Sequence, residues 1–452
     1  MKNIYFIGIG GIGMSAIARY YNAKGFKVSG YDKTPSPLTH ELESEGIEVH
    51  YEDNVDFVPK DVAETLVVYT PAVPKDMGEL VYVQENGYRV IKRSRMLGEI
   101  AEGQRCMAVA GTHGKTTTST LTSHIFTAAG EGCSAFLGGI SKNYHSNLIL
   151  SEKSDFVVIE ADEYDRSFLQ LTPYIAVITA TDPDHLDIYG TKENYLEGFA
   201  QFTERIRPDG YMIVHEGLEL VPRPVEGVTC YKYGRDKGDF RAENIRIGNG
   251  RILFDYISPL GNINDVELGV PVSINIDNGI AAMAVAQLSG ATNDEIKVAM
   301  ANFAGVERRF DFKLKEDNIV LLSDYAHHPD EIKACAKSMK ELYNDRKITA
   351  MFQPHLFSRT KDFYREFAES LSLFDEVILL DIYPARELPI PGVTSELIYN
   401  LIDEKVEKSL CARADAVKLI ADRKDEFEVL ICLGAGDLES DVSRITEILK
   451  KC

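Results

Sequence analysis

Short apolar runs alternate with helical patterns along almost the whole chain. Runs of strand length, such as IYFIGI at residues 4–9 and TLVVYT at 65–70, are followed by stretches with apolar residues at helical spacing. Strands that alternate with helices are typical of parallel sheets covered by helices. The pattern therefore predicts an α/β protein.

The alternation falls into three blocks, which predict three domains. The first block, residues 1–103, ends near the polar stretch AEGQR. The second, residues 104–308, contains a polar, glycine-containing segment at about 235–265 that predicts antiparallel hairpins, followed by two helices. The third block, residues 309–452, returns to alternating strands and helices. The expected strands of the second and third blocks are CMAVA, FVVIEAD, YIAVITATD, GYMIV, IVLLSDYA, KITAMFQ, DEVILLD and EVLICLG.

Length and composition fit this division. A chain of 452 residues is expected to form about three domains of roughly 100–200 residues each. No apolar run approaches the ~20 residues needed to cross a bilayer, so we expect no membrane association. Seven cysteines without a CxxC pair indicate reduced thiols in a cytoplasmic protein. The start, MKNIYFIGIGGIGMSAIA, could imitate a signal peptide, but its glycines are spaced for another purpose.

The net charge of −21 bears on the choice of ligand. Proteins that bind nucleic acid normally present a basic face to the phosphates, so we expect no nucleic-acid partner. Any anionic ligand must instead be met locally, by backbone amides, a few Lys or Arg side chains and a divalent cation.

A glycine-rich loop follows the first expected strand. Gly8, Gly10 and Gly13 satisfy GxGxxG, a spacing that lets the backbone approach a pyrophosphate at the N-terminus of the next helix. Asp32 follows at the end of the second strand, where an acid that binds a ribose belongs. A dehydrogenase, or a tight turn that only packs helix on strand, would also account for this motif.

The stretch GTHGKTTT, residues 111–118, stands between a strand and a helix in the second block. Lys115 is expected to reach the β- and γ-phosphates of a nucleotide, and Thr116 to offer its hydroxyl to Mg²⁺. Gly111 precedes Gly114 by only three residues, which departs from the usual GxxxxGK[ST] spacing. Two phosphate loops in successive domains predict two phosphorylated ligands, one of them ATP, which a dehydrogenase does not need.

Residues at neighbouring strand ends are candidate metal ligands. Glu160 lies at the end of FVVIEAD, and His185 lies just beyond the next strand, in DPDHLDIYG. Together with Thr116 they could bind Mg²⁺ beside the phosphate loop, as the Walker-B acid does in other NTPases. The alternative is a solvated acidic loop with an incidental histidine.

The third block places further candidates at strand ends and junctions. Adjacent side chains diverge, so His327 and His328 are better explained by a His-Pro turn that caps a helix than by a metal pair. Arg309 and Arg359 are candidates for binding phosphate or carboxylate, because a guanidinium fork suits both groups. A surface salt bridge is the alternative for each arginine.

Nine motifs resemble the Mur ligases of peptidoglycan synthesis in their order and spacing, from residue 4 to about residue 437. The resemblance implies a Rossmann-like N-terminal domain for a UDP-sugar, a central P-loop ATPase-type α/β domain with added antiparallel strands, and a Rossmann-like C-terminal domain for the amino acid. It also implies that ATP phosphorylates the lactoyl carboxylate of UDP-N-acetylmuramate and that L-alanine attacks the acyl phosphate. The motifs are GIGGIGMS, GTHGKTTT, EADEYDRSF, DPDHLDIYG, ERRFD, DYAHHPDE, FQPHLFSRT, YPARELPIPG and GAGD.

The resemblance also implies site residues, position by position. Mg²⁺, for which Mn²⁺ can substitute, is expected on Thr116, Glu160 and His185. His327 and Arg359 are expected to receive alanine, and with Lys115, Glu160 and His185 they form the expected catalytic set. The expected ATP-binding residues are Gly111, Thr112, His113, Gly114, Lys115, Thr116, Thr117, Asn275, Asn278 and, when the last domain closes, Arg309 and Asp324. The expected UDP-sugar-binding residues are Gly8, Gly10, Gly11, Gly13, Asp32, Thr70, Pro71 and Ala72.

This chain departs from the family pattern at several of these positions. Ile274 replaces the histidine of the usual HNxxN adenine motif, and Leu356 replaces an arginine that could help to bind the amino acid. The stretch LEGFAQF offers no lysine for carbamylation, so we expect the metal to be held without one. Relatives usually carry EADES where this chain has EADEY.

EADEY also occurs in a recycling ligase that attaches a whole tripeptide to the same sugar nucleotide, which is the main alternative function. The HHP turn, the PIPG loop and DHLDIYG favour the ligase that adds alanine. A non-catalytic nucleotide-sugar sensor is the second alternative, disfavoured by the intact Lys115, Glu160 and His185. For either enzyme we expect a monomer or a weak homodimer.

Overall fold

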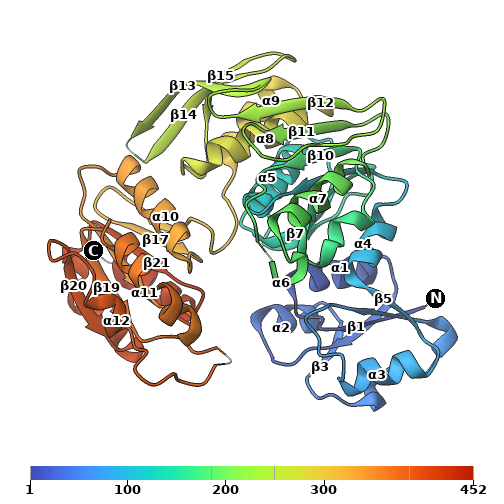
Figure 1. The fold of residues 1–452 in the computed structure, drawn as a ribbon, viewed down its shortest axis with the longest axis horizontal. Coiled ribbons are helices and arrows are strands. Elements are labelled where there is room, and N and C mark those ends of the chain that lie inside the picture. Colours follow the sequence, from blue (N-terminus) through green and yellow to red (C-terminus); the bar gives the residue numbers. More distant parts are fainter. Residues whose placement is uncertain (1, 185, 249, 386, 451–452) are drawn as a thin grey trace. The chain divides into compact units, whose positions relative to one another are not determined.

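The computed structural model describes residues 2–184, 186–248, 250–385 and 387–450. Three sheets organise these residues, as the alternating pattern predicts (Figure 1). By their contacts they divide into two compact units. The first unit comprises residues up to Ile245, Phe254–Gly269 and Ile274–Ala304, and holds the first sheet and most of the second. The second unit comprises Arg246–Leu253, Val270–Ser273 and the residues from Gly305 onward, and holds the third sheet.

The first sheet has the strand order β3-β2-β1-β4-β5 and is parallel throughout. The order reverses at β1, so the loop after β1 lies at the switch point where open α/β sheets bind their ligands. The strands are β1 (Asn3–Ile7), β2 (Lys27–Tyr31), β3 (Glu48–His50), β4 (Thr65–Tyr69) and β5 (Arg89–Lys92). The helices are α1 (Ile12–Ala23), α2 (Pro37–Ser44), α3 (Gly78–Glu85) and α4 (Arg93–Ala101).

The second sheet has ten strands, and its parallel centre contains β6 (Arg105–Ala110) between β9 (Phe156–Ala161) and β10 (Ile175–Ile178). The loop from β6 to α5 (Lys115–Ala128) therefore also lies at a switch point. An antiparallel pair, β7 (Ser134–Ser141) and β8 (Ser146–Ile149), forms one edge. The strands beyond β10 are β11 (Tyr211–His215), β12 (Thr229–Gly234), β13 (Phe240–Gly248), β14 (Arg251–Ile257) and β15 (Ile263–Glu267).

Helices cover this second sheet as the apolar spacing predicts. The two expected helices are α8 (Ile274–Leu288) and α9 (Asn293–Asn302), and α8 packs against α5 (Figure 1). The remaining helices are α6 (Leu186–Tyr189) and α7 (Lys192–Thr203), with a short 3-10 segment at Tyr164–Gln170. Strands β11–β15 therefore belong to the same sheet as β6, which precedes the phosphate loop. Helix α8 packs against α5, the helix that follows that loop.

A shared core joins the first two sheets. One cluster of buried apolar side chains contains Ile4 and Phe6 of β1 together with Val157 and Ile159 of β9. Helix α1 packs on both β7 and β8, with the Tyr20 and Phe136 rings 5.4 Å apart. Burial of apolar surface between the sheets explains why they form one compact unit.

The third sheet has the order β16-β17-β21-β18-β19-β20, and only the pairing of β16 with β17 is antiparallel. The four strands expected in this block are all present. The strands are β16 (Asp311–Lys315), β17 (Val320–Asp324), β18 (Ile348–Phe352), β19 (Glu376–Leu380), β20 (Glu407–Cys411) and β21 (Val429–Leu433). The helices are α10 (Pro329–Leu342), α11 (Phe357–Leu371), α12 (Glu396–Tyr399), α13 (Ala416–Asp422) and α14 (Glu439–Leu449).

Two global properties concern the described residues as a whole. None of their helices combines the length and apolar character that crossing a bilayer requires. Their six cysteines carry free thiols, and only Cys230 is exposed. Burial raises the pKa of Cys106, Cys133 and Cys432 to about 12, so these thiols stay protonated at neutral pH.

Candidate active site

The first glycine loop is held by the ends of its neighbouring strands. Gly8 has a φ of 87°, in the left-handed region, and a β-carbon there would lie 2.9 Å from the Thr70 methyl group. The Gly10 amide donates to Asp32 Oδ2 at 2.8 Å. Gly11 ends the loop as the N-cap of α1. The structure thus brings Gly8, Gly10, Asp32 and Thr70 together, and Pro71 and Ala72 follow Thr70 in the chain.

Arg93 lies beside this loop, although the sequence did not single it out. A β-carbon on Gly13 would lie 2.6 Å from Arg93 Nη1, so helix α1 passes directly over the guanidinium group. Arg93 Nη2 donates to Asp162 Oδ2 at 2.9 Å, and the arginine side chain is 21% exposed. Asp162 belongs to EADEY, so Arg93 connects the first glycine loop with the end of β9. The only sequence signal was the basic run KRSR.

The phosphate-loop lysine is paired with a buried carboxylate. Lys115 Nζ lies 2.8 Å from Glu163 Oε2 and donates to the Gly111 carbonyl at 2.5 Å. The side chain of Glu163 is 2% exposed, and this burial raises its pKa, while Lys115 acts in the opposite direction. Glu163 was not predicted from the sequence, because one acid among several in EADEYD gives no sign of where the turn after β9 places its side chain.

Thr116, in the first turn of α5, meets Glu160 at the end of β9, as their places beside neighbouring strand ends predict. Thr116 Oγ1 donates to Glu160 Oε1 at 3.0 Å, and the Gly138 amide of β7 donates to Glu160 Oε2 at 3.0 Å. Hydroxyl and carboxylate oxygens are the ligands that Mg²⁺ prefers, so this pair fits a hard divalent cation. The third expected ligand, His185, lies outside the described residues.

The remaining loop residues are fixed by β10 and α7. Thr112 Oγ1 donates to the Asp182 carbonyl at 2.7 Å and lies 2.8 Å from the Tyr195 hydroxyl. The Thr179 hydroxyl donates to the His113 carbonyl, and a β-carbon on Gly111 would collide with that hydroxyl. These contacts pre-form the loop, and Thr117 follows in the first turn of α5.

The two asparagines expected near adenine lie against the phosphate loop. Asn278 Nδ2 donates to Asn275 Oδ1 at 3.0 Å, and Asn278 Oδ1 accepts from Thr118 Oγ1 at 3.2 Å. A β-carbon on Gly114, whose φ is 81°, would lie 2.6 Å from Asn278 Oδ1. Ile274, at the start of the same helix, is 58% exposed. An apolar side chain is thus open to solvent at the start of the helix that carries the two asparagines.

In the second unit, Arg359 and His327 lie in one cluster with His355. Arg359 Nη1 is buried, and no described residue accepts a hydrogen bond from it. The His327 and His355 rings are 6.1 Å apart. Burial is the main cause that lowers the pKa of both histidines, and the Arg359 charge lowers both further. At neutral pH the cluster therefore offers one unsatisfied guanidinium donor beside two neutral imidazoles, which suits a carboxylate ligand.

The His-Pro turn caps α10, as expected. His328 is the N-cap and Pro329 is the first helical residue. Glu331 Oε2 accepts from the backbone amides of His327 at 2.9 Å and of His328 at 3.1 Å. These hydrogen bonds fix the backbone at His327 and therefore the position from which its side chain projects.

Asp324 and the two arginines of ERRFD form a separate group. Asp324 Oδ2 accepts from the Phe310 amide at 2.9 Å, and burial raises its pKa to about 6 although Arg309 opposes this. Arg309 itself is exposed. Arg308, which the sequence analysis passed over, stacks on the Tyr325 ring at 4.5 Å.

Two glycine loops at the switch points of open sheets, and a separate cluster with an unsatisfied buried guanidinium, are the arrangement that the sequence predicts for a three-domain ligase. The chain belongs to the Mur ligase family: it matches the family's catalytic domain at residues 3–105, its middle domain at 109–286 and its glutamate ligase domain at 308–438. The family uses ATP and with it a divalent metal. The expected three-domain architecture is confirmed.

One curated relative and two solved structures show which members of the family this chain resembles. UDP-N-acetylmuramate–L-alanine ligase of Phocaeicola vulgatus is 59% identical, over 100% of this chain and 99% of its own length. The crystal structure of UDP-N-acetylmuramate–alanine ligase from Thermotoga maritima superposes with a TM-score of 0.84 at 27% identity, covering 99% of each chain. A murein peptide ligase from Psychrobacter arcticus shares the fold with a TM-score of 0.67 at 22% identity, covering 100% of this chain and 99% of its own.

Proposed function

We propose that this protein joins L-alanine to the lactoyl carboxylate of UDP-N-acetylmuramate at the expense of ATP. The γ-phosphoryl group of ATP passes to a carboxylate oxygen, and ADP leaves. The alanine amine then attacks the carbonyl carbon of the acyl phosphate, and the tetrahedral intermediate expels phosphate and a proton as the amide forms. The observation that carries the proposal is the full-length 59% identity to a ligase of this name.

The phosphate loop performs the phosphoryl transfer. The amides of residues 113–117 cradle the phosphates, and Lys115 leaves Glu163 to neutralise the transferring group. Thr116 and Glu160, which already share a hydrogen bond of 3.0 Å, would hold Mg²⁺, or Mn²⁺ in its place, together with His185. The cation supplies positive charge where two polyanions must approach, and most of the catalysis is positioning and electrostatics.

The first glycine loop binds the UDP-sugar. The loop ends at the N-terminus of α1, where the first-turn amides of the helix and the helix dipole favour a diphosphate. Arg93, beside Gly13, adds a cation. The chain has a net charge of −21, so a diphosphate has to be met by local positive groups, and here these are the helix N-terminus and Arg93.

The cluster around Arg359 binds alanine. Its buried guanidinium nitrogen has no acceptor among the described residues and pairs with the alanine carboxylate. His327 is kept neutral by burial, so it can accept a proton from the alanine ammonium group, which must be deprotonated before it attacks.

These assignments divide the chain by ligand. Residues 1–103 bind the UDP-sugar, residues 104–308 bind ATP, and residues 309–452 bind the amino acid, with Arg309 and Asp324 serving the nucleotide. The substrates place the protein in the cytoplasm, where we expect a monomer or a weak homodimer.

Phosphate release from Mg·ATP and UDP-N-acetylmuramate tests the function directly. We expect turnover with L-alanine and none without an amine. Turnover only with the tripeptide L-Ala-D-Glu-diamino acid would move the protein to muropeptide recycling. No turnover with either amine, despite binding of both nucleotides, would make it a sensor.

Replacing Ile274 by histidine should strengthen ATP binding. An imidazole stacks on adenine through its ring face, and aromatic pairs contribute about 0.5–1.5 kcal/mol beyond area burial, so KM for ATP should fall about threefold. Val298→His, on α9 and 60% exposed, is the matched control and should leave KM for ATP unchanged. An unchanged KM in both variants would place adenine away from Ile274.

A further inference from the structure

A fully buried asparagine connects the second sheet to the start of helix α1. Asn147, in β8, donates from Nδ2 to the Ile12 carbonyl at 2.6 Å and to Ser15 Oγ at 2.8 Å. Ile12 is the first residue of α1 and directly follows Gly11 of the glycine loop. The contact is therefore made within one turn of the loop's end.

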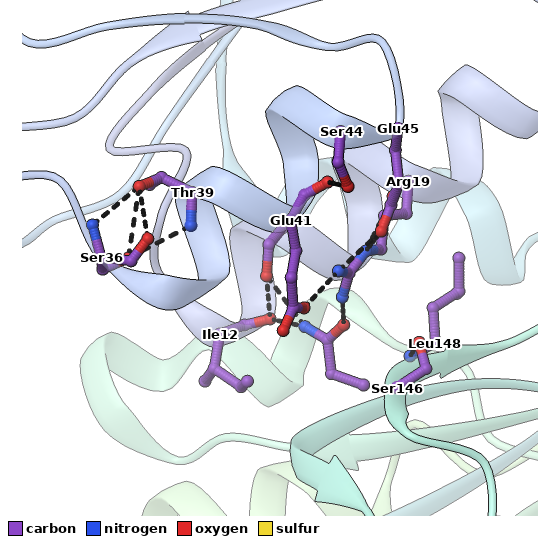
Figure 2. Close-up of polar contacts among 11 residues, drawn as sticks. Ile12, Arg19, Ser36, Thr39, Glu41, Ser44, Glu45, Ser146 and Leu148 are labelled. Atoms are coloured by element: carbon purple, nitrogen blue, oxygen red, sulfur yellow. Dashed lines mark hydrogen bonds and ion pairs between the residues drawn. The ribbon is translucent and has the colours of Figure 1, made fainter. Parts of the chain in front are cut away.

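The other end of the Asn147 amide is held by Arg19. Arg19 Nη1 donates to Asn147 Oδ1 at 2.6 Å, while Nε donates to Glu45 Oε1 at 2.8 Å and Nη2 to Glu41 Oε2 at 2.8 Å. Figure 2 shows Arg19 beside Glu41 and Glu45, with Ser146 and Leu148 of β8 nearby. Only 8% of the Arg19 side chain is exposed. Both polar atoms of the amide are thus satisfied inside the protein, which fixes its orientation.

Helix α2, which carries Glu41, also contacts the glycine loop. Glu41 lies in α2, whose N-cap is Ser36 in a capping box with Thr39 (Figure 2). A β-carbon on Gly10 would lie 2.7 Å from the Thr39 methyl group. Helix α2, which Arg19 ties to α1 and β8, therefore borders the loop on its other side.

The strand that carries Asn147 leads directly to the phosphoryl-transfer site. β8 pairs with β7, and β7 supplies the Gly138 amide that binds Glu160. Glu160 in turn accepts from Thr116 of the phosphate loop. A single antiparallel hairpin thus contacts the end of the glycine loop through Asn147 and the carboxylate Glu160 through Gly138.

We propose that Asn147 is a positioning residue, which sets the place of the UDP-sugar loop relative to Glu160 and the ATP phosphates. The inference rests on the proposed function, because it takes the glycine loop as the UDP-sugar site. Reacting atoms must approach to about 3–3.5 Å, and a displacement of about 1 Å can lower the rate about a hundredfold. A buried, doubly anchored amide limits such a displacement between the two loops.

Asn147→Ala, assayed in the full-length protein, tests the proposal. We expect kcat/KM for UDP-N-acetylmuramate to fall about thirtyfold, while the equilibrium affinity for a non-hydrolysable ATP analogue stays within about twofold. Arg19→Lys keeps the positive charge between the two glutamates but loses the guanidinium fork, so it should cause a smaller fall of the same kind. It also provides the test if Asn147→Ala does not fold.

Asn143→Ala is the matched control. Asn143 lies in the turn of the same hairpin and likewise links distant backbone: it donates to the Asn302 carbonyl and accepts from the Ala304 amide, both at 2.9 Å, and both partners lie outside α1. It should leave kcat/KM for UDP-N-acetylmuramate unchanged. If Asn147→Ala and Arg19→Lys lower only the melting temperature, as Asn143→Ala can, the positioning role is wrong and Asn147 is a structural contact alone.

The test separates this inference from the proposed function. A wild-type protein that turns over with alanine, combined with unaffected variants, would overturn the positioning role alone. If the wild-type protein shows no turnover with either L-alanine or the tripeptide, the proposed function is wrong. Equilibrium binding of UDP-N-acetylmuramate to wild type and Asn147→Ala, with and without the ATP analogue, would then decide on Asn147, because its loss should weaken the coupling between the two ligands.

Discussion

Lys115→Ala should lower kcat for ligation by about 10³-fold, because the transition state loses a positive charge aimed at the transferring phosphoryl group. Affinity for UDP-N-acetylmuramate should stay within about twofold, since the glycine loop belongs to a different sheet. Steady-state phosphate release and calorimetric titration with the UDP-sugar measure the two effects separately. Loss of both activity and UDP-sugar binding would contradict the assignment of two independent loops.

The buried partner of Lys115 calls for a second variant. Removing the lysine takes away the cation that lies 2.8 Å from the Glu163 carboxylate, which is only 2% exposed, and this can cost about 3 kcal/mol of stability. The double variant Lys115→Ala/Glu163→Gln removes that charge, so it should recover the melting temperature without recovering turnover. Lys232→Ala, whose exposed ammonium lies 3.4 Å from Glu216, is the matched control and should change neither quantity.

Arg359→Ala should raise KM for L-alanine about a hundredfold, because a buried guanidinium–carboxylate contact is worth several kcal/mol when one partner is truncated. KM for ATP and for UDP-N-acetylmuramate should change little. Arg359→Lys keeps the charge but loses the two-pronged geometry, so its effect should be intermediate. Initial rates over a range of alanine concentrations provide the measurement.

Arg365→Ala is the control for this prediction. Arg365 lies in the same helix, is exposed, and donates to the neighbouring Tyr364 hydroxyl at 3.1 Å. It should leave KM for alanine unchanged. Equal effects of the two substitutions would indicate damage to α11 and would remove Arg359 from the alanine site.

The elements with strong local signals were predictable from the sequence. Strand-length apolar runs predict β1, β6 and β9, and the loop that follows β6 and the end of β9 bring Thr116 and Glu160 together. The carboxyl ends of parallel strands share one edge of a sheet, so topology alone brings such residues into contact. His328 and Pro329 were predictable as a helix cap for the same local reason.

The contacts that sequence could not predict depend on single polar residues in turns and at edges. Glu163 reaches Lys115 only because the chain turns immediately after β9, and Asn147 reaches Ile12 only because α1 packs on β8. Neither residue belongs to a periodic pattern. Asp32 combines both cases. Its position at the end of the second strand predicts a contact with a ribose, whereas the hydrogen bond that it accepts from the Gly10 amide depends on how the loop folds.

The pairing of Lys115 with Glu163 has a consequence for how the nucleotide leaves. The lysine has a carboxylate partner at 2.8 Å, so a phosphate group that binds Lys115 would have to displace an existing ion pair and would bind less tightly than to an unpaired ammonium. An internal anion that competes with the product for one cation would shorten the residence time of ADP and let the next catalytic cycle begin.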